Sequence, residues 1–285
     1  MSGDDGVTRA TRWTAAAITP FLVIAAVLLF GFPDRTGELF AWAIAPPLSA
    51  YLLASAYVGG VWFFVRTARA RRWDDVKHGF PAVVVFASLL LVATLLHLDR
   101  FSQNLSFAVW MILYATTPVV VAALWLRESR RAGPPASSEG EVLVSRPVRT
   151  ILVLVGGAAA VAGLALFLFP DAVIPVWAWE LTPLTARVTG AVLTLTGVVN
   201  GALARDARWG AFRVLFQAQL ISLIAIAVSL VLGGGALAWE RPAAAGFVAL
   251  VGVALVLYGA VAWRYERLRR RARHPGASAA PARPA

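Results

Sequence analysis

The stretch FGFPDRTGELFAWAIAPPLSA at residues 30–50 decides the fold, because a second version of it, FLFPDAVIPVWAWELTPLTA, stands at residues 167–186. The Phe-Pro-Asp turn recurs 137 positions later, and the Ala-Trp pair keeps the same offset. Further along, ARARRW at residues 68–73 recurs as ARDARW at residues 204–209, 136 positions on. Matches that keep their order and a nearly constant offset indicate an internal duplication.

Long apolar runs surround both copies of this stretch. A helix needs about 20 mostly apolar residues to cross the hydrocarbon layer of a membrane. Eight runs meet this length approximately: Trp13–Phe32, Ile44–Phe64, Phe80–His97, Phe107–Leu126, Thr150–Phe169, Thr185–Leu203, Phe212–Leu232 and Ala243–Trp263. The 285 residues are 59% hydrophobic and 14% charged, whereas a soluble domain is about 45–50% apolar and about 25% charged. The sequence therefore predicts an all-α membrane protein with eight transmembrane helices.

Each copy of the duplication contains four of these runs. An even number of spans returns the chain to the side where it started, so both copies enter the membrane in the same direction. This predicts two parallel four-helix repeats related by a pseudo-two-fold axis along the membrane normal. The predicted units are residues 1–131 and 148–271, joined by a cytoplasmic linker at 132–147 and followed by a disordered basic tail at 272–285.

The distribution of Lys and Arg predicts the orientation. With the N-terminus inside, 22 of the 26 basic residues fall in cytoplasmic segments, as the positive-inside rule requires. Both termini are then cytoplasmic, and the net charge of +11 reflects membrane orientation rather than nucleic-acid binding. We expect anionic lipids of the inner leaflet to contact the basic residues near the C-terminus, namely Arg264, Arg267, Arg269, Arg270 and Arg271.

Tryptophans fall near both ends of the predicted spans. This placement is typical of the aromatic belts that anchor membrane proteins at headgroup depth. Trp42 and Trp179 each lie eight positions after the acid of a Phe-Pro-Asp turn, Asp34 and Asp171 respectively. A second interpretation is that these four residues form the outer mouth of a ligand site.

A polar cluster of His97, Asp99 and Arg100 follows the third run, and glycines at positions 233 and 235 stand at the corresponding place in the second half. A metal or proton-handling site at His97 and Asp99 would need further ligands from the acids on the same side: Asp34, Glu38, Asp171 or Glu180. The alternative is a solvated helix end with interfacial charges.

The second half has polar residues that the first half lacks, including Arg187, Asn200 and Gln217. Arg187 can extend toward the outer headgroups, and the two amides can form hydrogen bonds between helices. The alternative is a polar crevice between the two halves, with Arg187 facing an anionic group of a ligand.

We expect no cofactor. The chain has no cysteine, which excludes disulfides, thiolate zinc sites and iron–sulfur clusters. It also has no Walker loop, no HExxH and no GxSxG motif.

The segment AWAIAPP at residues 41–47, with its preceding Phe-Pro-Asp turn, and the segment LHLDRF at residues 96–101 resemble uncharacterised multipass integral membrane proteins of high-GC bacteria. The composition, rich in Ala, Arg and Val, fits such a genome. The resemblance implies a bacterial plasma-membrane location and no particular activity.

Three functions remain open at this point. The first is binding or transport of a small or lipid-like solute between the two repeats, where transporter sites commonly lie. The second is a scaffold or accessory subunit in a homodimer or membrane complex. The third is a membrane enzyme with an outer-face site at His97 and Asp99, which we favour least. The midpoints of the spans carry no ionisable residue, and this argues against a proton- or sodium-coupled transporter.

Overall fold

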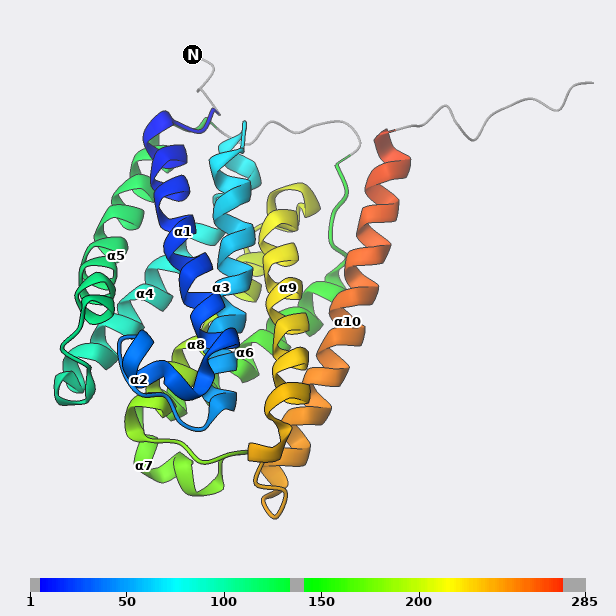
Figure 1. Ribbon diagram of the computed structural model, residues 1–285. Helices are drawn as coiled ribbons and strands as arrows, with labels where there is room; N and C mark the ends of the chain where they lie inside the picture. Colours follow the sequence, from blue (N-terminus) through cyan, green and yellow to red (C-terminus); the bar gives the residue numbers. More distant parts are fainter. Residues whose placement is uncertain (1–5, 134–140, 274–285) are drawn as a thin grey trace, which may run out of the picture.

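The computed structural model describes residues 6–133 and 141–273, and these residues are helical with isolated β-bridges and no strands. Eight long helices make up the bundle in Figure 1: α1 (Arg9–Gly31), α3 (Pro47–Ala68), α4 (Gly79–Leu96), α5 (Leu105–Arg131), α6 (Arg146–Leu168), α8 (Pro183–Gly201), α9 (Trp209–Gly233) and α10 (Pro242–Arg273). All eight are long and apolar enough to cross a membrane, which supports a multipass membrane protein. Residues 274–285 of the predicted basic tail and residues 134–140 of the predicted linker lie outside the described residues.

The helix starts follow from local sequence chemistry. The Thr8 hydroxyl accepts a hydrogen bond from the Thr11 amide at the start of α1, and the Asn104 side chain accepts one from the Phe107 amide at the start of α5. Thr182 and Thr185 form a reciprocal capping box at the start of α8. Such caps satisfy amide groups that have no partner inside the helix. Proline occupies the first position of α3, α8 and α10, where its missing N–H costs little.

Two short helices lie at the duplicated Phe-Pro-Asp turns. They are α2 (Thr36–Leu39) and α7 (Pro170–Val173), and Figure 1 places both at the end of the bundle opposite the start of α1. We call this the far end. The near end is the one where α1 begins and α10 ends (Figure 1).

The packing crosses between the two halves of the chain. α1 packs on α3, and α6 packs on α8. α3 also packs along α9 of the second half, and α8 packs along α4 of the first half. In keeping with this central position, 67% of the most apolar window of α3 and 56% of that of α8 is buried, against at most 39% in the other long helices. The interior is therefore built around α3 and α8.

α6 and α8 approach so closely that their backbones touch. A Cβ atom added at Gly163 would lie 2.5 Å from the carbonyl oxygen of Gly190. Small residues permit such an approach, and van der Waals packing of this kind drives helix association in lipid.

Burial corrects the interpretation of several tryptophans. Trp42, Trp110, Trp179, Trp73 and Trp209 are at most 5% exposed, so they pack inside the protein instead of anchoring it in the surrounding lipid. Trp13, Trp239 and Trp263 are 74%, 60% and 64% exposed, as an anchoring role requires. The positions of tryptophans along the chain predict their depth but not whether they face the core.

Candidate functional site

A cavity of about 720 Å³ lies among the eight long helices, and every one of them contributes lining residues. The lining is almost entirely apolar. Leu154 of α6 and Leu250 of α10 are part of it and are 66% and 55% exposed, so the cavity reaches the flank of the bundle. Its volume lies within the range of about 300–1,000 Å³ that is common for small-molecule sites. The cavity therefore suits an apolar ligand that enters from the side.

Two tyrosines form one polar point in the cavity wall. Tyr57 of α3 and Tyr114 of α5 are 2% and 4% exposed, and their hydroxyl oxygens lie 2.9 Å apart. Both residues line the cavity. Their shared hydrogen bond satisfies one hydroxyl proton, and the second remains available to an acceptor.

A second polar point lies on α9 and α10. The Gln219 amide nitrogen donates a hydrogen bond of 3.2 Å to the hydroxyl of Tyr258, and both residues line the cavity. The side-chain oxygen of Gln219 is buried without a hydrogen-bond partner. This oxygen is a buried acceptor without a partner, and the amide would have to turn toward the cavity for it to meet a ligand hydroxyl.

Asn200 bonds to Tyr258 but does not itself line the cavity. Its side chain is fully buried, and its amide nitrogen donates to the carbonyl oxygen of Leu152 at 2.8 Å and to the Tyr258 hydroxyl. Asn200 thus links α8 to α6 and α10 and positions Tyr258. The predicted interhelical role of this amide is confirmed by these bonds. Gln217 also lies outside the cavity lining, and its side-chain oxygen is buried without a partner.

The residues predicted for the outer mouth are at the far end and do not line the cavity. Asp34 and Asp171 are exposed. Trp42 forms an isolated β-bridge with Phe101, and Trp179 forms one with Leu237. The Trp179 indole nitrogen donates to the Ser49 hydroxyl at 3.0 Å, which joins the two halves. The two tryptophans are therefore part of the packed interior at the far end of the bundle.

His97 and Arg187 are brought together by the end of α4 and the start of α8. The distance between His97 Nε2 and Arg187 Nη1 is 2.7 Å, so a neutral imidazole accepts this bond. Partial burial, together with the charge of Arg187, lowers the pKa of His97. Asp99 pairs instead with Arg100, at 3.1 Å, and both are more than two-thirds exposed. Among the described residues, no group of three His, Asp or Glu side chains could hold a metal ion.

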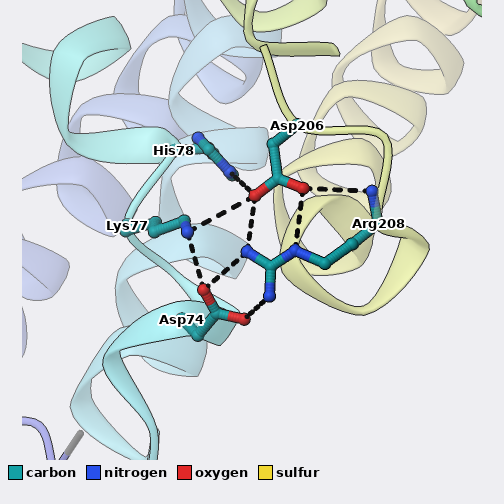
Figure 2. A network of polar contacts seen from close by, with 5 residues as sticks. All are labelled: Asp74, Lys77, His78, Asp206 and Arg208. Atoms are coloured by element: carbon teal, nitrogen blue, oxygen red, sulfur yellow. Dashed lines mark hydrogen bonds and ion pairs between the residues drawn. The ribbon is translucent and has the colours of Figure 1, made fainter. Parts of the chain in front are cut away.

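A compact charged network, missed by the sequence analysis, joins the halves at the near end. Figure 2 shows Arg208 between two carboxylates. Its Nη1 lies 2.6 Å from Asp74 Oδ2, and its Nη2 lies 2.6 Å from Asp206 Oδ2. Lys77 Nζ lies 2.6 Å from Asp74, and His78 Nε2 lies 2.9 Å from the other carboxylate, that of Asp206. Each of these side chains is at most 21% exposed.

The network fixes the charge state of its acids. Burial alone would raise the pKa of Asp206, but hydrogen bonds from His78 and Arg208 outweigh it and hold that pKa far below its usual value. Bonds from Arg208 and Lys77 likewise lower the pKa of Asp74 despite its burial. Both carboxylates remain charged at neutral pH, so the network acts as an electrostatic clamp between the halves.

A signal for this clamp was present in the duplicated segments ARARRW and ARDARW. Each lies in a basic turn that also contains aspartate: Asp74 follows the first, and Asp206 lies inside the second. Acids in otherwise basic turns suggest ion pairs, although the sequence does not say that the two turns meet.

Comparisons with known proteins give no further guide to the site. No protein-family model, no curated protein and no solved structure matches the chain.

Proposed function

We propose that this protein binds a lipid-like molecule in the cavity of about 720 Å³, and that it lies in a bacterial plasma membrane. The observation that carries the proposal is the cavity itself: large, apolar, reaching the flank of the bundle, and provided with two polar points. Membrane lipid surrounds such a flank, so an amphiphile could enter without crossing water. Tyr57, Tyr114 and Gln219 would meet its few polar atoms.

The two halves are proposed to be parallel repeats related by a pseudo-two-fold axis along the membrane normal. Paired contacts support this. α1 on α3 matches α6 on α8, and α3 on α9 matches α8 on α4.

Contacts at both ends of the bundle support the same relation. The β-bridge between Trp42 and Phe101 has a counterpart between Trp179 and Leu237. These two residues lie 137 and 136 positions further along the chain, respectively. At the near end, Thr8 at the start of α1 bonds to Glu128 of α5. Ser145 at the start of α6 donates to Tyr265 of α10.

The near end is proposed to face the cytoplasm. It carries the clamp residues, the basic turns after α3 and α8, and the arginines near the end of α10, whereas the far end carries few basic residues. The positive-inside rule favours this orientation.

Filling the cavity tests the proposed function. Ala254 of α10 lines the cavity, whereas Val256 lies on the opposite face of the helix, does not line it, and is 74% exposed. We expect Ala254→Phe to reduce the amount of dioleoylglycerol bound to the purified protein in native mass spectrometry, with Val256→Phe as the matched control. Equal binding by both variants and the unsubstituted chain would refute the proposal. A chain that binds no lipid but co-purifies with a stoichiometric partner would favour the scaffold.

A further inference from the structure

A second hollow, of about 540 Å³, opens at the near end where α3, α9 and α10 converge. Arginines dominate its wall. The six that line it are Arg66, Arg69, Arg71, Arg72, Arg213 and Arg269. Acids are fewer, with Asp74, Asp75 and Glu141 completing the charged lining.

Some of these charges are already neutralised inside the protein. Asp74 belongs to the clamp, and Arg213 and Arg269 pair with Glu266 of α10. In contrast, Arg69 and Arg71 are exposed, and their side chains have no ion-pair or hydrogen-bond partner among the described residues. Their guanidinium groups offer donors in a fork that matches phosphate oxygens.

This basic pocket and the apolar cavity share the same helices. On α3, Phe63 lines the cavity and Arg66 lines the basic pocket, one helical turn later. On α9, Leu215 lines the cavity and the adjacent residue Val214 lines the basic pocket. Three residues along a helix correspond to about 4.5 Å. Along α3 and α9 the walls of the two hollows therefore adjoin, whereas on α10 their nearest lining residues, Tyr258 and Arg269, are eleven positions apart.

We propose that the basic pocket binds the phosphate of an anionic phospholipid whose acyl chains enter the apolar cavity. This deepens the proposed function and rests on it. Basic pockets between transmembrane helices at the cytoplasmic side are typical sites for anionic headgroups. The positive-inside rule explains many arginines at this end, but it does not require those of residues 66–72 to share one hollow with Arg213 and Arg269. The pocket thus selects the phosphate and the cavity accepts the chains.

The test compares three probes on the purified full chain by native mass spectrometry. Dioleoylphosphatidylglycerol has both phosphate and acyl chains, dioleoylglycerol has the chains alone, and glycerol 3-phosphate has the phosphate alone. We expect the first to bind at least about tenfold more tightly than either of the others, because two guanidinium–phosphate contacts add about this factor or more.

Two double variants separate the pocket from the general basic character of the near end. Arg69→Gln with Arg71→Gln removes the unpaired arginines of the pocket. The matched control, Arg127→Gln with Arg130→Gln, removes two exposed arginines of α5 that do not line it. We expect the first pair to abolish the tenfold preference for dioleoylphosphatidylglycerol over dioleoylglycerol and the control pair to retain it.

Three results would overturn the inference. These are equal affinity for the two lipids, equal loss of preference in both double variants, or glycerol 3-phosphate binding as tightly as the phospholipid, which would identify a soluble phosphate as the ligand. Failure of the proposed function has a different signature. In that case Ala254→Phe would leave the affinity for both lipids unchanged.

Discussion

The two ends of the bundle join the halves of the chain by different physical means. At the near end, Arg208 of the second half lies between Asp206 and Asp74, so the contact between halves is ionic. At the far end, Trp179 of the second half is fully buried and bonds to Ser49 of the first. Its indole ring also packs on Phe247, with ring centroids 5.2 Å apart. The far end thus depends largely on packing, although the His97–Arg187 contact there also joins the halves and can respond to pH, whereas the near end depends on charge.

The largest expected effect comes from removing packing at the far end. Trp179→Ala empties a site that is 0% exposed, and such truncations cost about 3–5 kcal/mol of unfolding free energy. Trp239→Ala is the control, because that side chain is 60% exposed and its loss should cost less than about 0.5 kcal/mol. Equilibrium unfolding in mixed detergent micelles measures both. Equal losses would show that the far end is not held by buried aromatic packing.

A smaller loss is expected at the near end. Arg208→Met leaves two carboxylates without their shared cation, and breaking a buried pair costs about 3–5 kcal/mol. Because these side chains are 11–15% exposed, water reduces the cost, and we expect about 2–3 kcal/mol. Arg205→Met is the control at an exposed arginine three residues away. If high salt leaves the Arg208→Met effect unchanged, the clamp does not act through charge.

The smallest expected effect is a change in stability with pH at the far end, in a pH range where the near end does not respond. The pKa of His97 is lowered from 6.5, so the folded protein favours the neutral ring, and stability falls as pH drops below about 6.5. Protonation also removes the acceptor that Arg187 uses. We expect a loss of a few tenths of a kcal/mol between pH 7 and 5, absent in His97→Asn.

Acid acts on the near end in a lower pH range. The pKa values of Asp74 and Asp206 are lowered from 3.8, so the stability that they contribute is present above about pH 4 and is lost only as pH falls further. Because His78 also bonds to Asp206, the test uses a His78→Gln chain, in which a near-end response between pH 7 and 5 would contradict this order.

Much of the helical fold was predictable from the sequence. Each predicted span overlaps one long helix, because length and hydropathy determine which segments can cross a membrane. The end of α10 differs most: the helix continues to Arg273, ten residues past the predicted Trp263. Arginines are good helix formers, so the helix does not stop where hydropathy falls.

The candidate site was much less predictable. Hydropathy does not say which face of a helix meets which neighbour, so Tyr57 and Tyr114, which are 57 positions apart, gave no joint signal. Tryptophan positions similarly suggested lipid anchoring for Trp42, although it is 2% exposed. The missed tyrosine pair and the misassigned tryptophan have one cause. A single sequence specifies how deep in the membrane a residue lies more directly than it specifies which residues it contacts.

The crossed packing of α3 has a consequence for synthesis of the chain. The hydroxyls of Ser55 on α3 and Ser229 on α9 lie 3.1 Å apart, yet they are 174 positions apart in the sequence. The ribosome must therefore add most of the second half before α3 meets this partner. Until then, α3, which has one of the lowest hydropathies of the eight, lacks its contact with α9, so completion of its core contacts is timed by translation.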